Sequence, residues 1–149
     1  MDYLHGTEYV LKQESEMFHM GSDTELLGCF MKVRRNDSVL DIGTNNGALL
    51  LYASFHGAEK LTGIDLFEEV IEQAEYNAEI NHVKMNLIVS SLQDFHSGPF
   101  DLILCNPPYF HTSEKRLKNE NRYLRAARHE EYLCLEDLFA GVRRLLKSN

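Results

Sequence analysis

The stretch S-V-L-D-I-G-T-N-N-G, residues 38–47, decides the fold of this 149-residue chain. Its first five residues form a short apolar run that predicts a buried strand. Two glycines and two asparagines follow as a turn signal, and the apolar residues after Asn46 predict a helix that Gly57 stops. A strand, a glycine-containing turn and a helix in this order are typical of the opening of a βαβ unit.

Strands and helices alternate along the rest of the chain. We expect further strands at residues 60–65, 85–89 and 100–105, and further helices at residues 67–78 and 135–146. This alternation predicts an α/β fold, in which a mainly parallel sheet carries helices on both faces. Ligands of such folds bind beyond the carboxyl ends of the strands.

A further helix is expected near the N-terminus. Ser22-x-x-Glu25 fits a capping box, in which two side chains satisfy the first amides of a helix. The apolar positions that would form its buried face are Leu26, Leu27, Phe30 and Met31.

Composition bounds the class of protein. A length of 149 residues fits one domain, residues 1–149, and 44% hydrophobic with 26% charged residues is ordinary for a globular protein. We find no run of 18 apolar residues and no signal peptide. Three widely spaced cysteines and scattered histidines fit neither a disulfide framework nor a metal site. The sequence thus predicts a cytoplasmic protein with no membrane partner and no metal.

The charge is unevenly distributed. The net charge of −8 argues against a nucleic-acid-binding protein. Between residues 115 and 128, however, only one acid accompanies the basic residues Lys115, Arg116, Lys118, Arg122, Arg125 and Arg128. Such a segment can contact phosphates, although a solvated loop has the same composition.

The turn after the first strand has the features of a ligand cradle. Asp41 ends the strand, and Gly43 and Gly47 follow with the spacing D-x-G-x-x-x-G, which differs from the dinucleotide fingerprint. Glycines let the backbone approach a ligand, and the helix N-terminus favours a carboxylate. The acid before the first glycine suits an ammonium group, so a ligand with the carboxylate and ammonium groups of an amino acid fits this turn. The alternative is an ordinary strand-turn-helix connection whose glycines serve only the turn.

Acids also follow the next two strands. Asp65 ends the second strand and can accept both hydroxyls of a ribose, or instead cap the following helix. Asp94, after the third strand, can bond the amino group of an adenine. Together with the glycine turn, these positions predict a pocket for an adenosyl amino acid, and S-adenosylmethionine is the candidate.

With these motifs in place, the chain resembles a family. D-I-G-T-N-N-G, I-D at 64–65, Q-D at 93–94 and N-P-P-Y-F at 106–110 look like a class I methyltransferase that methylates amino groups. The flanks F-H-M-G-S-D-T-E-L-L and A-R-H-E-E-Y-L-C-L-E-D-L are similar to bacterial tRNA (adenine-N6)-methyltransferases that modify a valine-accepting tRNA. The resemblance covers residues 17–147 and implies a Rossmann-like methyltransferase fold, S-adenosylmethionine as cofactor and RNA as partner. The implied cofactor-binding residues are Asp41, Gly43, Asn45, Gly47, Asp65, Asp94 and Asn106.

The N-P-P-Y-F motif carries the implied chemistry. The lone pair of an aromatic exocyclic amine is delocalised, so the amine is a poor nucleophile. The side-chain oxygen of Asn106 and the carbonyl of Pro107 can each accept one amine hydrogen and aim the lone pair at the methyl donor. Pro108 helps to fix the loop, and Tyr109 and Phe110 offer faces on which an extruded base can stack. The resemblance thus implies the catalytic set Asn106, Pro107, Pro108 and Tyr109.

The substrate itself is less well specified. The residues implied to contact it are Tyr109, Phe110, Lys115, Arg116, Arg125, Arg128 and His129. Alternatives with the same chemistry are guanine in ribosomal RNA, adenine in DNA and glutamine in a release factor. A cofactor- or RNA-binding fragment without turnover is another. We expect Cys105, at the end of an apolar strand, to be a small buried hydrophobe rather than a nucleophile.

Two departures from the family pattern stand out. Asn45 replaces the middle glycine of the usual motif, and asparagine tolerates left-handed backbone better than other non-glycine residues. The resemblance implies further strands after the helix that follows the fourth strand, and we expect these C-terminal strands to be missing from this chain. We therefore expect an incomplete methyltransferase domain with an exposed sheet edge, through which the chain could form a homodimer.

Overall fold

A computed structural model of the chain describes residues 1–14, 19–107 and 135–148. Its centre is a four-stranded parallel sheet with the strand order β5-β4-β3-β6. The strands are β3 (Ser38–Ile42), β4 (Lys60–Asp65), β5 (Asn86–Val89) and β6 (Leu102–Cys105). The sheet confirms the α/β fold that the alternating pattern predicted.

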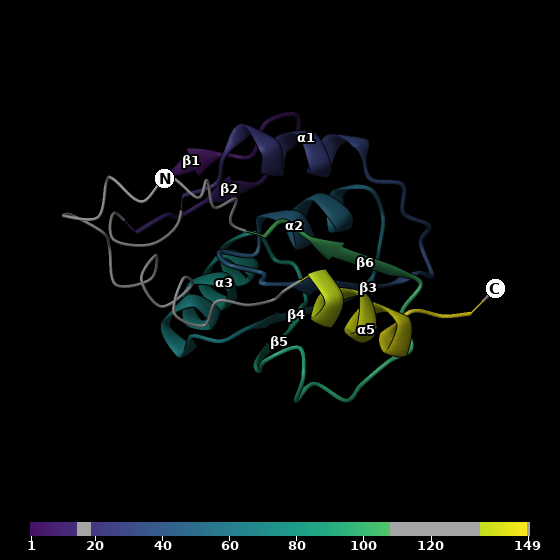
Figure 1. The fold of residues 1–149 in the computed structure, drawn as a ribbon. Coiled ribbons are helices and arrows are strands. Elements are labelled where there is room, and N and C mark those ends of the chain that lie inside the picture. Colours follow the sequence, from purple (N-terminus) through teal and green to yellow (C-terminus); the bar gives the residue numbers. More distant parts are fainter. Residues whose placement is uncertain (15–18, 108–134, 149) are drawn as a thin grey trace, which may run out of the picture.

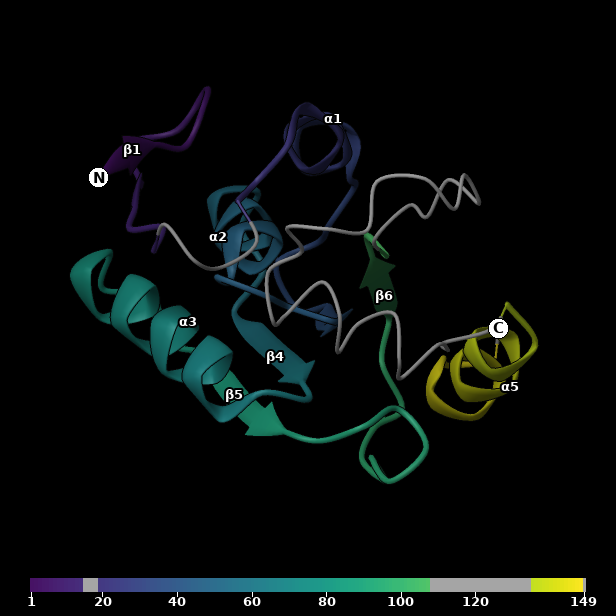
Figure 2. The ribbon, with the colours of Figure 1, turned by 60° about the vertical axis from the view of Figure 1, so that its left-hand side comes forward.

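Helices cover both faces of this sheet (Figures 1 and 2). Helices α2 (Ala48–Phe55) and α3 (Glu68–Ile80) follow β3 and β4, and α1 (Ser22–Phe30) packs outside α2. On the opposite face lies α5 (Leu135–Leu145). Each crossover connection returns the chain to the side of the sheet where the strands begin, here called the amino edge. The carboxyl ends of all four strands therefore lie together at the opposite side, here called the carboxyl edge.

Side chains of the central strand alternate between two apolar clusters. Val39 on β3 packs with α2, whereas its neighbour Leu40 packs toward Leu145 on α5. The same alternation holds on β6, where Leu104 joins the first cluster and Ile103 the second. Burial on both faces explains why these strands are nearly continuous apolar runs.

The N-terminal segment forms a small antiparallel pair, β1 (Asp2–Tyr3) with β2 (Val10–Leu11), which the sequence did not lead us to expect. A row of amide side chains on and just after α3 anchors it. Asn81 exchanges two hydrogen bonds with the backbone of Val10, at 2.8 and 2.7 Å. Asn77 does the same with Lys12, at 2.8 and 3.0 Å, and Gln73 adds a bond to the Lys12 carbonyl at 2.9 Å.

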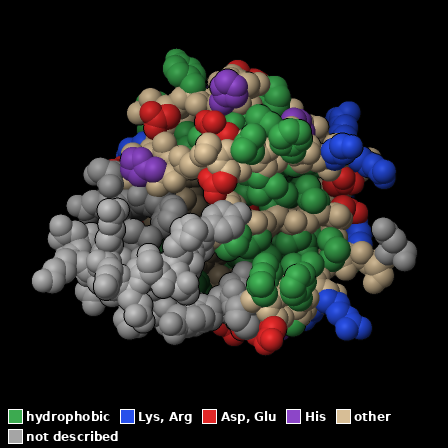
Figure 3. All heavy atoms as spheres, turned by 45° about the horizontal axis from the view of Figure 1, so that its top comes forward, with side chains coloured by type: hydrophobic (Ala, Val, Ile, Leu, Met, Phe, Trp, Pro, Cys, Tyr) green, Lys and Arg blue, Asp and Glu red, His purple; other side chains and the backbone are tan. Residues whose placement is uncertain are grey.

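The predicted capping box is wrong. Helix α1 begins at Ser22, its N-cap is Gly21, and no side chain caps it. The expected apolar face is also only partly buried, because Leu26 and Phe30 are 59% and 78% exposed. Figure 3 shows hydrophobic side chains gathered among acids and histidines on the side of the molecule that carries α1.

The fourth strand is shorter than predicted. Phe100 and Asp101 precede β6, and Phe100 instead forms an isolated parallel bridge with Leu146. This bridge ties the end of α5 to the amino edge of the sheet. Within the described ranges, no helix has the length and apolar character needed to cross a membrane.

Candidate active site

The turn between β3 and α2 adopts the backbone that a ligand cradle requires. Gly43, Asn45 and Gly47 have positive φ angles of 68°, 49° and 81°. The backbone N–H groups of Gly43 and Thr44 both donate to the Ile64 carbonyl at 2.9 Å, which fixes the turn against β4. Asn45 thus takes the left-handed conformation in place of glycine, as the sequence predicted. A Cβ added at Gly43 would meet nothing within 4 Å, so this part of the turn borders open space.

Asp41 is a buried carboxylate under this turn. Only 1% of the residue is exposed, and among the described residues neither its Oδ1 nor the hydroxyl of Thr44 has a hydrogen-bond partner of good geometry. Burial raises the pKa of Asp41 to about 7; the nearby Thr44 hydroxyl opposes this shift, and the charge of Asp65 adds to it. A buried acid with an unpartnered oxygen is suited to meet a cation.

Asp65 lies at the end of β4, beside the same turn. Its Oδ2 accepts the N–H of Asn45 at 3.1 Å, and its Oδ1 accepts the N–H groups of Leu66 at 2.8 Å and Phe67 at 3.4 Å. Phe67, rather than Asp65, is the N-cap of α3. The carboxylate is therefore held in one orientation, and it joins the glycine turn to the second strand end.

Asp94 follows β5 in an exposed turn. The Ser91 hydroxyl donates to its Oδ2 at 2.7 Å, and its own N–H donates to that hydroxyl at 3.1 Å. These local bonds explain the turn without a ligand. An adenine contact at Asp94 thus stays a prediction.

Asn106 directly follows β6 at the carboxyl edge. Because Ile42 pairs with Cys105 in register, the first residue of the glycine turn and Asn106 leave neighbouring strands at the same level. The Asn106 Nδ2 donates to Asp23 Oδ2 at 3.0 Å and to Thr24 Oγ1 at 2.9 Å. No described residue donates to its Oδ1.

Pro107 is the last described residue of the N-P-P-Y-F motif. Outside the described residues lie Pro108, Tyr109, Phe110, Lys115, Arg116, Arg125, Arg128 and His129, together with the rest of the basic segment. Their predicted roles stay predictions.

Cys105, the last residue of β6, packs against the cluster that contains Leu40 and Leu145. Burial, with the charge of Asp41, raises the pKa of the Cys105 thiol to about 12. The thiol therefore stays protonated at neutral pH, which disfavours a nucleophilic role.

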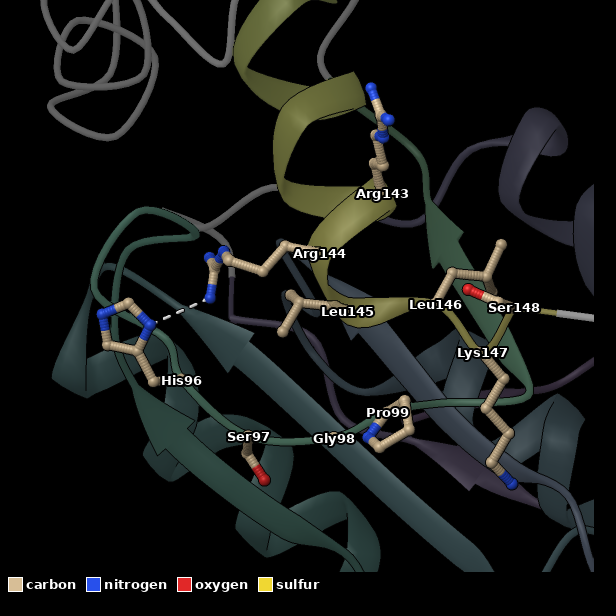
Figure 4. A pocket seen from close by; sticks show the side chains of 10 residues that line it. All are labelled: His96, Ser97, Gly98, Pro99, Arg143, Arg144, Leu145, Leu146, Lys147 and Ser148. Atoms are coloured by element: carbon tan, nitrogen blue, oxygen red, sulfur yellow. Dashed lines mark hydrogen bonds between the residues drawn. The ribbon is translucent and has the colours of Figure 1, made fainter.

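A hollow lies at the opposite edge of the sheet from the glycine turn, lined by residues 96–99 and 143–148 (Figure 4). Arg144 crosses it and donates to the carbonyls of Phe95 at 2.6 Å and Leu92 at 2.7 Å, and it contacts His96 Nδ1 at 3.0 Å. Lys147 pairs with Asp101 at 2.6 Å, and this bond, with those from Ser38, holds the pKa of Asp101 below its ordinary value. These basic groups fasten α5 to the amino edge, remote from the glycine turn.

Sequence reasoning missed Asp23 and Thr24 as site residues. They lie in the first turn of α1, 83 and 82 residues before Asn106, and no local pattern links them to it. The signal available was the F-H-M-G-S-D-T-E-L-L stretch itself, which the sequence used only to define the family and a helix start.

Among the described residues, no group of three or more His, Cys, Asp or Glu side chains could hold a metal ion. The part of the chain that the structure describes presents a glycine turn, two acids and an oriented amide at one sheet edge. The hydrogen-bonding groups match an organic ligand that carries a cation and hydroxyls.

Comparison with known proteins identifies a family and several relatives. The model of the methyltransferase small domain matches residues 11–133. A tRNA1(Val) (adenine(37)-N6)-methyltransferase of Aeromonas salmonicida is 35% identical over 131 residues, covering 85% of this chain and 54% of that protein. A putative protein N5-glutamine methyltransferase of Methanocaldococcus jannaschii is 35% identical over 104 residues, covering 70% of this chain and 53% of that protein.

A solved structure supports the fold. The ribosomal protein L11 methylase of Lactobacillus delbrueckii subsp. bulgaricus superposes with a TM-score of 0.62 at 25% identity, covering 88% of this chain and 57% of that one. The chain spans about half the length of the curated relatives it matches. The parallel sheet, the glycine turn at its carboxyl edge and the match over residues 11–133 lead to one conclusion: the chain belongs to the methyltransferase small domain family.

Proposed function

We propose that this chain carries the catalytic half of an S-adenosylmethionine-dependent methyltransferase that acts on the exocyclic amine of adenine in tRNA. Membership of the methyltransferase small domain family supports the reaction. The names of relatives that align with 85% to 93% of the chain support the substrate. Because the chain spans about half of each relative, activity and substrate are proposals for the whole enzyme.

One observation carries the proposal: the glycine turn and Asn106 leave neighbouring parallel strands at the same edge. Ile42 and Cys105 are partners in the sheet, so the residues that follow them face the same space. A methyl donor in the cradle would therefore lie beside an amine held by Asn106. Proximity of this kind removes much of the entropic cost of a reaction between two molecules.

The residues present fit the cofactor at both of its polar ends. Asp41 supplies a buried carboxylate whose Oδ1 has no hydrogen-bond partner among the described residues, and this oxygen suits an ammonium group. The fixed carboxylate of Asp65 has the acceptors that ribose hydroxyls need. When bound, S-adenosylmethionine would supply an electrophilic methyl group.

The chain's own groups then act on the amine. The Asn106 Oδ1 and the Pro107 carbonyl accept its two hydrogens, which turns the nitrogen lone pair out of conjugation with the ring. A preorganised pair of acceptors stabilises the positive charge that develops on nitrogen during transfer. The methylated nitrogen is then acidic enough to release its proton to water, so no strong base is required.

A second candidate is methylation of a glutamine side chain in a protein, which the name of the Methanocaldococcus jannaschii relative supports. Adenine and glutamine both present a planar nitrogen with two hydrogens, so the same acceptors serve both. The glutamine-modifying relative aligns with 70% of this chain, whereas the Aeromonas salmonicida tRNA-modifying relative aligns with 85% of it. The predicted basic segment at residues 115–128 also favours RNA over a protein.

The test is Asn106→Ala, assayed with an unmodified valine-accepting tRNA and with a glutamine-containing release factor. We expect methyl transfer to tRNA to fall by at least about a hundredfold, because the variant loses one of the two acceptors. Binding of S-adenosylhomocysteine should change little.

Asn86→Ala is the matched control, because Asn86 is an exposed asparagine on β5 at the other end of the strands. Wild-type rates in Asn106→Ala would refute the mechanism. If the wild type methylates the release factor but not tRNA, glutamine methylation, the second candidate, would be established.

A further inference from the structure

We infer that Asp23 and Thr24, at the start of α1, are positioning residues that set which face of the Asn106 amide meets the methyl acceptor. The inference rests on the proposed function and deepens it. It assigns a role in the reaction to a helix that lies outside the strand ends and the glycine turn.

The observation is a pair of hydrogen bonds from one nitrogen. Asn106 Nδ2 donates to Asp23 Oδ2 at 3.0 Å and to Thr24 Oγ1 at 2.9 Å. A primary amide has two N–H donors, and both are used here. The oxygen of the same amide receives no bond from any described residue.

The chemistry of the partners fixes the orientation. An ionised carboxylate can accept hydrogen bonds but cannot donate them. If the amide rotated by half a turn, its oxygen would face the Asp23 carboxylate and the two would repel each other. Asp23 therefore excludes the orientation in which Asn106 would offer hydrogens, rather than an acceptor, to the amine.

The same contacts make the amide oxygen a better acceptor. Donation of both amide hydrogens, one of them to a charged group, draws electron density toward the carbonyl oxygen. The Asn106 Oδ1 is therefore both directed and polarised before a substrate arrives. Such preorganisation lowers the barrier because no group has to turn during the reaction.

Helix α1 is itself held rigidly enough to act as a template. A Cβ added at Gly28 would lie 2.2 Å from the Tyr52 ring, so α1 and α2 approach as closely as glycine allows. His56, the C-cap residue of α2, contacts the Gly28 carbonyl at 2.9 Å. Helix α1 is thus tied to the same helix that starts at the glycine turn.

The experiment pairs each disruptive variant with a conservative one. Thr24→Val removes the acceptor and keeps the shape, whereas Thr24→Ser keeps the hydroxyl. Asp23→Asn allows both orientations of Asn106, whereas Glu25→Gln removes an equal charge from the same helical turn without touching Asn106. Each variant is made in the full chain.

Two measurements distinguish a change in the orientation of Asn106 from a general loss of folding and from an error in the proposed substrate. The first is the single-turnover rate of methyl transfer at saturating tRNA, alongside the affinity for S-adenosylhomocysteine. The second is the pair of side-chain amide signals of Asn106 in a ¹H–¹⁵N spectrum, identified by its absence from Asn106→Ala. This second readout needs no activity.

We expect Thr24→Val and Asp23→Asn to lower the rate by about tenfold to a hundredfold and to shift the Asn106 amide signals. Thr24→Ser and Glu25→Gln should stay within about twofold of the wild type, and cofactor affinity should hold throughout. Unchanged rates and amide signals in the disruptive variants would overturn the inference. A wild-type chain that methylates no tRNA would instead show that this chain alone does not carry out the proposed reaction, while the amide spectra would still decide the orientation of Asn106.

Discussion

At the scale of single residues, Asp41 is the most unusual group in the described part of the chain. A strand residue this deeply buried is normally apolar, yet this one is an acid with an oxygen that no described residue satisfies. Such a group costs stability, and its retention makes sense if a ligand supplies the missing partner. The cost should be visible in how stability depends on pH.

We expect Asp41→Asn to be more stable than the wild type above neutral pH and closer to it in acid. The pKa of Asp41 rises from 3.8 to about 7 on folding, so between these values the folded state keeps a proton that the unfolded chain has lost. The wild type therefore loses stability as pH rises through this window, by on the order of 4 kcal/mol at most. The variant's neutral amide cannot ionise, so Asp41→Asn should lose none of it.

Urea unfolding at pH 4 and pH 8 measures the difference. Asp101→Asn is the control with the opposite sign. Its pKa is lowered by Lys147 and Ser38, so the wild-type advantage at Asp101 should be present at both pH 4 and pH 8 and disappear only as pH falls below the ordinary value, which a third measurement at pH 2 follows. A gap between Asp41→Asn and wild type that does not widen with pH would show that folding does not raise the pKa of Asp41.

Asp65 gives a direct test of the cofactor cradle. We expect Asp65→Ala to weaken S-adenosylhomocysteine binding at least about tenfold, a loss of ~1.4 kcal/mol, because the ribose hydroxyls lose a charged acceptor. Calorimetric titration of both proteins measures this. Asp94→Ala is a useful comparison, since Asp94 already bonds Ser91 and its predicted adenine contact would show as a separate loss. Equal affinity in Asp65→Ala and wild type would contradict the cradle.

At the scale of elements, the contact between α1 and α2 depends on Gly28. The Tyr52 ring is almost fully buried and fills the place where a Cβ at this position would be. We expect Gly28→Ala to lower the free energy of unfolding by about 1–3 kcal/mol, because the helices must separate or the ring must move. Cys29→Ala, at the exposed neighbouring position, should have little effect. Chemical denaturation of both variants provides the measurement, and equal stabilities would mean that the contact is not tight.

The elements that the sequence predicted best are those buried on both sides. The bounds of β3 and β4 match the expected residues 38–42 and 60–65. Each strand is a short, mostly apolar stretch, and the turn residues that follow it mark where it ends. Helix α1 was predicted less well. The capping-box pattern at Ser22 involves only neighbouring residues. In the structure the N-cap is Gly21, and Asp23 and Thr24 accept hydrogen bonds from Asn106, which is distant in the sequence.

The site shows the same division between local and distant information. Asp41, Asp65 and Asn106 were predictable as neighbours because parallel strands end at one edge of a sheet. The orientation of the Asn106 amide was not, since it depends on packing that places the start of α1 beside the end of β6. The N-terminal pair β1 and β2 was missed for a similar reason, as its anchoring bonds run to side chains on and just after α3.

At the scale of the whole molecule, β6 is the last strand on one side of the described sheet. We still predict that the chain pairs through this edge, because unpaired strand groups bind other strands. Sedimentation analysis at rising protein concentration should then show a dimer. Replacing Leu102 by proline should abolish it: the Asp101 N–H bonds Ser38 on β3, so the next N–H along the strand faces the free side, and proline removes it. Val89→Pro on β5, the strand at the other side, removes an N–H that also faces away from the sheet and is the comparison. A monomer at all concentrations would refute the prediction.

The row formed by Gln73, Asn77 and Asn81 affects how the N-terminal segment unfolds locally and exposes its backbone amides to solvent. Two of these side chains accept the amide hydrogens of Val10 and Lys12, which are therefore sheltered by a helix rather than by a strand. Their exchange with deuterated solvent should follow the opening of α3, at a slower rate than that of the neighbouring Thr7 amide. The first dozen residues thus report, through the kinetics of isotope exchange, on the integrity of a helix more than sixty residues away.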